Sequence, residues 1–475
     1  MLKQKLYLAI TIFFLLTQFF PPLGYVLPVG GALDIAVFVG LSLILYPKIL
    51  LRRSMIALFL YGVIIFFLFL SGNAFFKSFD LVVIPILNMM AALYIFEYAT
   101  SYDKDFKYTK IVIIVVAVFN ALMALLSIPQ LLINPNIIRI MDDANVTDAM
   151  MGSAKYLLLT KYATLHGLPF LFAPIAFLIR KMVVINKTKA LFWIFILAVL
   201  FALLVLANSA TAFLMAAITM LLGFFIRFEK FTRENVWKMI ILAGLGLLLI
   251  RPSVIIPVID VAQSFMPDNG ATSIRLEELK DAYMYGESDG DLEIRQNLYN
   301  TSQSLFFESP LIGTQRPEQI SNHTWIWDRL ACLGIFMIIP LAMVFVFHMK
   351  KAYGVLCRTK VVYTFGAIAL ITMLYYKNEF GMGTWLYGFA ILPLLCRYID
   401  SLLNTSKLIN KKNYWCLIKN LIEPTEKGTN LSASPQRFVI LRLLQLKFQI
   451  YGQRYKFLRT AGTKSANKND GQVKN

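Results

Sequence analysis

Runs of about twenty apolar residues, repeated along most of the chain, are the feature that most constrains the fold. A helix needs about 20 mainly apolar residues to cross the hydrocarbon core of a bilayer, and soluble domains rarely contain many such runs in series. Only 15% of the residues are charged, whereas 58% are hydrophobic. We therefore expect an all-α polytopic integral membrane protein with about 12 transmembrane helices.

The expected spans divide into two groups, one before and one after a long polar segment. The first group covers about residues 6–22, 31–47, 54–71, 79–97, 111–133, 156–179, 190–207, 210–227 and 236–256, and the second covers 326–347, 360–376 and 383–399. Residues 190–227 are interrupted only at Asn208-Ser209-Ala210-Thr211, which favours a tight hairpin over one long helix. The predicted organisation is therefore membrane helices in 1–251, a large outside loop in 252–325, membrane helices in 326–399 and a basic tail in 400–475.

Lysine and arginine alternate between rich and poor loops along the chain. Clusters such as Lys48, Arg52 and Arg53 fall on one side, and the short loops on the other side contain almost no cations. By the positive-inside rule, both termini are cytoplasmic, and the first apolar run, which no cleavage site follows, is retained. The formal net charge of +19 is therefore mainly a topology signal, and no motif indicates a nucleic-acid partner. None of the 4 cysteines falls in an outside loop, so we expect neither a disulfide nor a metal cluster.

Two segments depart from the pattern of short loops. The outside loop at 252–325 contains two helical patterns separated by a Gly/Asp/Ser turn, so we expect two short helices there. The first pattern is Ile274, Leu276, Leu279 and Tyr283; the second is Ile294, Leu298 and Leu305, with Arg295, Tyr299 and Ser302 on its opposite face. The basic tail is compatible with a helix on anionic lipid or with a strand, and the sequence leaves both open.

Cations gather at the predicted outer face, where the positive-inside rule would otherwise deplete them. The outside loop holds Arg275, Arg295, Arg316 and His323, while Lys161 and His166 fall in the outer half of the sixth span. Asp328 and Arg329 follow at the start of the tenth span, where a paired interface anchor is the alternative to a functional role. Arginine binds phosphate oxygens bidentately, so the cluster suits an anionic lipid headgroup such as a pyrophosphate.

The stretch from Arg295 to Gly334 resembles the O-antigen polymerase and O-antigen ligase superfamily of bacterial surface-polysaccharide assembly. That family has an Arg, a spacer, then F-x-x-x-P-L-x-G, a loop with Asn-His or His-Asn, and L-x-x-x-G-x-x-G entering a span. The matching segments here are Arg295, Phe306-Phe307-Glu308-Ser309-Pro310-Leu311-Ile312-Gly313, Asn322-His323 and Leu330-Ala331-Cys332-Leu333-Gly334-Ile335-Phe336. About a dozen spans with a large periplasmic loop in the second half also match the family's plan.

The resemblance implies an O-antigen or capsular polysaccharide polymerase in the cytoplasmic (inner) membrane of a bacterium. Such an enzyme joins undecaprenyl-pyrophosphate-linked oligosaccharide repeat units at the outer face, as a glycosyltransferase without metal ion, nucleotide sugar or other cofactor. Implied partners are the lipid-linked oligosaccharides, membrane lipid, a chain-length regulator and a flippase. In this interpretation Arg295 and Arg275 stabilise the departing pyrophosphate, and His323 is either the general base or a further phosphate donor.

The remaining substrate-binding candidates are Lys161, Arg316, Tyr299 and Arg329. The family often has a Ser-Arg pair at the hairpin where this chain has Ser209 and Ala210, so Lys161 is a candidate to replace that arginine. Two alternative functions stay open: an O-antigen ligase that transfers polymer to the lipid A core, and a lipid-linked oligosaccharide flippase. The sugars, their linkage and the oligomeric state are not encoded in any pattern that we recognise.

Overall fold

The structure is a computed structural model, and every regular element in the part that it describes is a helix. It describes residues 2–20, 31–70, 79–140 apart from 136, 159–226 apart from 208, 252–264, 291–315, 324–376 and 382–403, with a few single positions between them. Of residues 291–295 it describes the backbone. The tail beyond residue 403 lies outside the described residues, so its expected helix or strand stays open.

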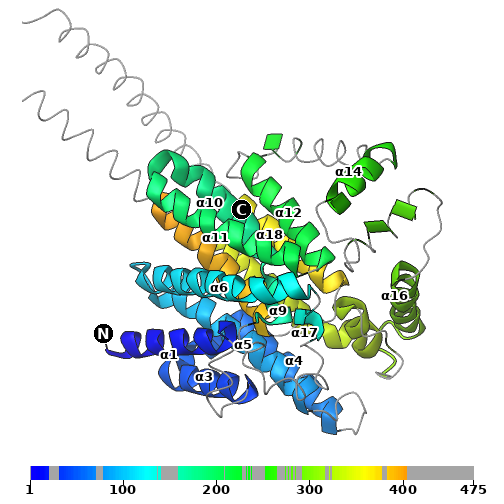
Figure 1. Cartoon of the computed structure of the whole chain (residues 1–475). Helices are drawn as coiled ribbons and strands as arrows, with labels where there is room; N and C mark the ends of the chain where they lie inside the picture. The colour runs from blue at the N-terminus through cyan, green and yellow to red at the C-terminus, as the bar shows by residue number, and fades with distance from the viewer. Residues whose placement is uncertain are drawn as a thin grey trace, which may run out of the picture. The chain divides into compact units, whose positions relative to one another are not determined.

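The described helices follow one another along the chain (Figure 1). The first half contains α1 (Leu2–Phe19), α3 (Gly31–Leu45), η1 (Pro47–Leu51), α4 (Arg53–Leu70), α5 (Phe79–Tyr102), α6 (Lys107–Ile133), α7 (Ile137–Ile140), α9 (Tyr162–Gly167), α10 (Pro169–Ile185), α11 (Lys187–Leu206) and α12 (Ala210–Phe225). The second half contains α14 (Pro252–Ser264), α16 (Asp291–Glu308), α17 (Trp325–Val355), α18 (Lys360–Tyr376), α19 (Met382–Trp385) and the π-helical turn η5 (Leu386–Ile391). The helix continues beyond η5 to residue 403.

These helices coincide with the predicted apolar spans, as expected of a helical membrane protein. Four segments are long and apolar enough to cross a bilayer: Lys107–Ile133, Lys187–Leu206, Trp325–Val355 and Gly383–Leu403. Shorter apolar helices cover Leu33–Leu45, Arg53–Leu68, Thr211–Phe225 and Lys360–Tyr375. Large apolar side chains such as Phe59, Phe67 and Val184 point outward, which suits a lipid environment. The total of about 12 spans and their sidedness remain predictions, and most of the expected span at 236–256 lies outside the described residues.

α10 lies between α11, α12 and α18 (Figure 1). Its residues from Pro169 to Ile179 are all buried, because a helix that is apolar on every side is stable when other helices surround it. The predicted hairpin after residue 207 is confirmed, since α11 ends at Leu206 and α12 starts at Ala210. Both helices of this hairpin pack on α10.

The predicted sixth span is interrupted, because α9 and α10 meet at Gly167, Leu168 and Pro169. The aromatic ring of Tyr387, on η5, packs directly on Gly167. A Cβ atom on that glycine would lie 2.1 Å from the Tyr387 ring, so only glycine allows this contact. The π-helical turn is thereby held against the break in the sixth span.

Two buried side chains of the last helix bind loops at the side predicted to be cytoplasmic. The Arg397 guanidinium donates hydrogen bonds to the carbonyl oxygens of Ala99 and of Asp103, the second at 2.7 Å. The Asp400 carboxylate accepts hydrogen bonds from the backbone N–H of Cys357 at 2.6 Å and of the next residue at 3.0 Å. Charged groups here satisfy backbone groups that the ends of α5 and α18 leave unpaired.

An ion cluster joins three other elements at the same side. The carboxylate of Glu97, 1% exposed, is paired with the Lys351 ammonium of α17. Arg52 Nε lies 3.7 Å from this carboxylate, and Ser54 Oγ donates to it at 3.4 Å. These contacts thus hold α4, α5 and the end of α17 together.

The segment predicted as the outside loop contains two described helices, α14 and α16, and a turn at 309–315. α16 lies where the second of the two short helices was expected, and single described positions between 273 and 284 are helical in the region of the first. α14 was not expected: it begins inside the predicted end of the ninth span and continues to Ser264. Lys280 donates to Asp260 of α14 at 2.6 Å, and this hydrogen bond raises the pKa of Lys280.

Candidate functional site

α17 contains a sharp reversal at Gly334, whose backbone has φ 66° and ψ 178°. The rings of Trp325 and Phe345 lie 6.1 Å apart. In a straight helix, two residues so far apart in sequence would be separated by about 30 Å. Residues 325–333 therefore fold back along the second half of α17. The expected continuous span at 326–347 was wrong in this respect, because Gly334 adopts a conformation that no helix interior accommodates.

The turn before α17 satisfies the backbone groups that this reversal leaves unpaired. Thr314 N–H donates to the carbonyl of Ala331 at 2.8 Å, and Ile335 N–H donates to the carbonyl of Pro310 at 2.9 Å. The neighbouring pairs, Gln315 with Cys332 and Phe336 with Leu311, bond at 3.3 and 3.1 Å. An interrupted helix is tolerated in a membrane protein when other protein groups fulfil its hydrogen bonds. Residues 310–315 and 331–336 thus form one joint.

Two glycines make the joint possible. Both have positive φ, 73° at Gly313 and 66° at Gly334. A Cβ atom on Gly313 would lie 2.2 Å from the carbonyl oxygen of Cys332, and one on Gly334 would lie 2.3 Å from the nitrogen of Gly313. The glycines of F-x-x-x-P-L-x-G and of L-x-x-x-G are therefore in direct backbone contact. Met337 stands where the longer form of the second pattern has another glycine.

α16 docks on the folded-back half of α17 through a buried polar contact. Ser302 Oγ donates to Asp328 Oδ1 at 2.6 Å, and Thr324 N–H donates to Asp328 Oδ2 at 3.2 Å. Asp328 is 2% exposed and Ser302 is fully buried. Phe306 adds an aromatic contact with Trp327, with ring centroids 5.9 Å apart. The alternative of an interface anchor for Asp328 is thus replaced by a specific structural contact.

The structure describes three of the predicted site side chains. Lys161 is exposed at the start of α9, while Tyr299 on α16 and Arg329 on α17 are half-buried. Arg329 lies close enough to Tyr61 of α4 for an electrostatic interaction. Position 295 belongs to α16, on the same helix face as Tyr299 and Ser302. Arg275, Arg316 and His323 lie outside the described residues.

α19 connects the folded-back half-helix to the neighbourhood of Lys161. Trp385 packs edge-on against Trp325, with ring centroids 5.5 Å apart. The preceding Thr384 donates from Oγ1 to the carbonyl of Ala163 at 3.4 Å, two residues after Lys161. The start of α17, α19 and α9 are far apart in the sequence, and these contacts bring them into one region of the structure.

Lys161 also has a counter-charge nearby. Asp34 of α3, 9% exposed, is close enough to Lys161 for electrostatic attraction and is hydrogen-bonded to Thr17 of α1. His166, one turn further along α9, is buried and packs edge-on against Tyr162 at 4.5 Å. Lys161 is thus accessible, whereas His166 is enclosed.

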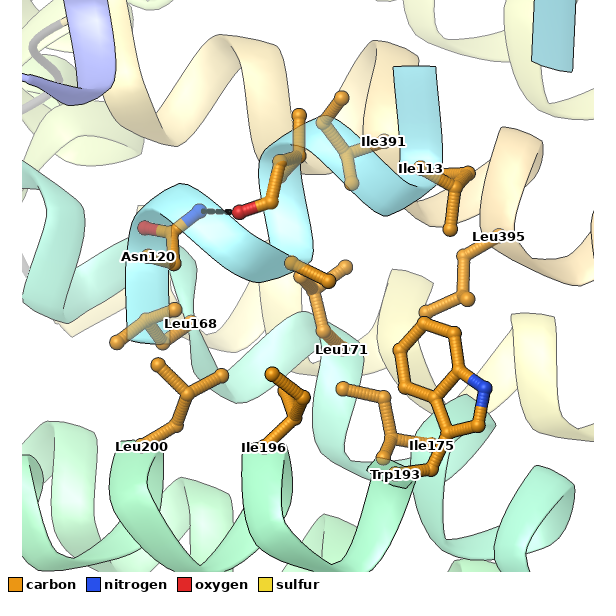
Figure 2. A pocket seen from close by; sticks show the side chains of 12 residues that line it. Ile113, Asn120, Leu168, Leu171, Ile175, Trp193, Ile196, Leu200, Ile391 and Leu395 are labelled. Carbon is orange, nitrogen blue, oxygen red and sulfur yellow. Dashed lines mark hydrogen bonds between the residues drawn. The ribbon is translucent and has the colours of Figure 1, made fainter. Parts of the chain in front are cut away.

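A separate small apolar pocket, with a volume of about 20 Å³, lies between helices of the bundle (Figure 2). Its lining comes from α6, α10, α11 and the last helix, and includes Leu171, Trp193 and Leu395. Its polar lining residue, Asn120, donates from its amide to the Val116 carbonyl at 2.8 Å and accepts a hydrogen bond from the Tyr387 hydroxyl. With its polar group paired internally and room for little more than a water molecule, this pocket cannot hold a sugar or a diphosphate.

The Ser302–Asp328 contact is the feature that sequence reasoning missed. The helical pattern had grouped Ser302 with Arg295 and Tyr299, which was the available signal, but a pattern on one helix does not identify the residue that it meets on another. Within the described ranges, no group of three or more His, Cys, Asp and Glu side chains could hold a metal ion. A scan against protein-family models, a search of curated proteins and a search of solved structures each found no match to this chain.

Proposed function

We propose that this chain is an O-antigen or capsular polysaccharide polymerase of a bacterial inner membrane. It joins undecaprenyl-pyrophosphate-linked oligosaccharide repeat units at the outer face of that membrane. Both chain ends are cytoplasmic, and the segment 252–325 is periplasmic. An O-antigen ligase, which differs in its acceptor, is the nearest alternative.

The observation that supports this proposal is the joint between Gly313 and Gly334. The resemblance rested on a loose pattern of residues separated along the chain, and such patterns often match by chance. Here the glycines of both parts contact each other and have a conformation that requires glycine. The pattern thus has a physical cause in this chain, and the helix that carries position 295 ends at the same joint.

In the proposed reaction, an acceptor hydroxyl attacks the anomeric carbon of the donor sugar, the bond to the pyrophosphate oxygen breaks, and undecaprenyl pyrophosphate departs. Negative charge grows on the departing phosphate, so the Arg295 and Arg275 guanidinium groups stabilise the transition state more than the ground state. His323 accepts the proton of the attacking hydroxyl or donates a hydrogen bond to phosphate. Arg316, Arg329 and Lys161 attract the anionic donor.

The test of this assignment is Arg295→Ala, with Gln296→Ala as the matched control on the exposed side of α16. We expect Arg295→Ala to reach normal levels in the membrane but to lose roughly 10²–10³ in turnover, as when an oxyanion donor is removed. Chain-length distribution on a lipopolysaccharide gel reports the loss. A wild-type ladder from Arg295→Ala would remove Arg295 from the mechanism.

Analysis of a deletion strain separates the alternatives. One repeat unit on the lipid A core indicates a polymerase, whereas bare core with lipid-linked polymer indicates a ligase. Repeat units trapped on the cytoplasmic side indicate a flippase. Only the first outcome is compatible with the proposal.

A further inference from the structure

We propose that Asp328 and Ser302 are positioning residues, which align α16, and with it Arg295, against the folded-back half of α17. This inference rests on the function proposed above and adds two residues that the resemblance does not include. Position 295 lies two helical turns, or about 10 Å, from Ser302 on the same face of α16. The Ser302–Asp328 contact is thus near enough to position 295 to determine which way that face of α16 points.

The contact joins one carboxylate to two partners. Asp328 receives one hydrogen bond from a hydroxyl and one from a backbone N–H, so both of its oxygens act as acceptors. An ionised carboxylate has only acceptors, whereas an asparagine would place its NH₂ group against the Ser302 hydroxyl, which would then accept the hydrogen bond and not donate it. Hydrogen bonds to a charged acceptor are also shorter and stronger than neutral ones, in agreement with the 2.6 Å distance to Ser302.

The helix stays attached when this contact is lost. Leu305 is buried, Phe306 contacts Trp327, and the backbone joint at Gly313 holds the chain just after α16. Removing the hydroxyl of Ser302 therefore changes the alignment of α16 without releasing it. A displacement of about 1 Å at a reacting group can reduce a rate by about a hundredfold.

The experiment compares Ser302→Ala, Ser302→Thr and Asp328→Asn with the control Ser304→Ala. Ser304 is exposed on α16, and its hydroxyl bonds locally to the Thr301 carbonyl. Polymerisation is measured with purified protein in liposomes that contain undecaprenyl-pyrophosphate-linked repeat units. We expect kcat to fall about tenfold to a hundredfold in Ser302→Ala and Asp328→Asn, with KM for the donor little changed. Ser304→Ala retains the wild-type rate, and Ser302→Thr, which keeps the hydroxyl, loses less activity than Ser302→Ala.

A double mutant distinguishes positioning from a general loss of structure. If Ser302 acts through Arg295, then Ser302→Ala has no further effect on kcat once Arg295→Ala is present. Additive losses, or equal rates for Ser302→Ala and Ser304→Ala, would overturn the inference. If the wild type itself forms no polymer, the proposed function fails and the inference fails with it. If the wild type is active, the Ser302 variants decide the inference alone.

Discussion

At the scale of single residues, the conformation of Gly334 determines how α17 is built. A non-glycine residue at this positive φ costs about 1–2 kcal/mol, and its Cβ would overlap the backbone of Gly313. We expect Gly334→Ala to reduce the free energy of unfolding by at least about 2 kcal/mol. Thermal unfolding of the purified protein in detergent measures the change.

The same helix provides the control for this substitution. No atom lies within 4 Å of a Cβ placed on Gly354, near the end of α17. Gly354→Ala should therefore be neutral or stabilise by up to about 1 kcal/mol, because alanine favours a helix over glycine. Equal unfolding temperatures for the two variants would contradict the described reversal at Gly334.

A second prediction at this scale concerns Glu97. Replacing it by Gln leaves the Lys351 ammonium without its counter-charge in a mostly enclosed position. Since Lys351 and Arg52 are partly exposed, we expect a loss of roughly 1–3 kcal/mol, less than for a fully buried pair. The double variant Glu97→Gln/Lys351→Met should recover part of it in a double-mutant cycle. Independent, additive losses would show that the pair is not coupled.

At the scale of elements, α16 connects the predicted periplasmic loop to the joint. α16 packs on α17, whereas α10 packs on α11, α12 and α18. The helices around α10 are therefore held mainly by contacts with one another. Loss of α16 should therefore affect function more than membrane insertion.

Deleting residues 274–307, while keeping the turn at 309–315, tests this separation. We expect the protein to remain in the membrane and polymer formation to cease, because Arg275, Arg295 and the Ser302 contact are all removed. The measurement is a lipopolysaccharide gel together with an immunoblot of the membrane fraction. Normal polymer from this deletion would exclude α16 from the site and favour a transporter, whose activity needs only the bundle.

At the scale of the whole molecule, the sequence predicted the positions of the apolar helices well. Length and hydropathy determine where a chain can enter a bilayer, and the hairpin after Leu206 followed from a single polar interruption. α16 followed from its helical pattern. The reversal in α17 did not, because an apolar run looks the same whether the helix is straight or folded back. Gly334 was the local signal, but only its contact with Gly313 reveals what it does.

The candidate site was predicted less completely, for the same reason. The arginines and the histidine could be grouped because the sequence predicts that they lie on the same side of the membrane. The hydrogen bond between Ser302 and Asp328 depends on how two helices dock, and no periodicity on either helix contains that information. The central claim is that this chain forms glycosidic bonds from a lipid-linked donor. Only an assay of that reaction tests it.

The most direct measurement supplies purified wild-type protein, in liposomes, with undecaprenyl-pyrophosphate-linked repeat units as the only sugar source. We predict a ladder of lipid-linked polymer and release of one undecaprenyl pyrophosphate for each linkage formed, with both products formed roughly 10²–10³ more slowly by Arg295→Ala. Intact donor and no ladder, from wild-type protein that is folded by its thermal unfolding transition, would contradict the account.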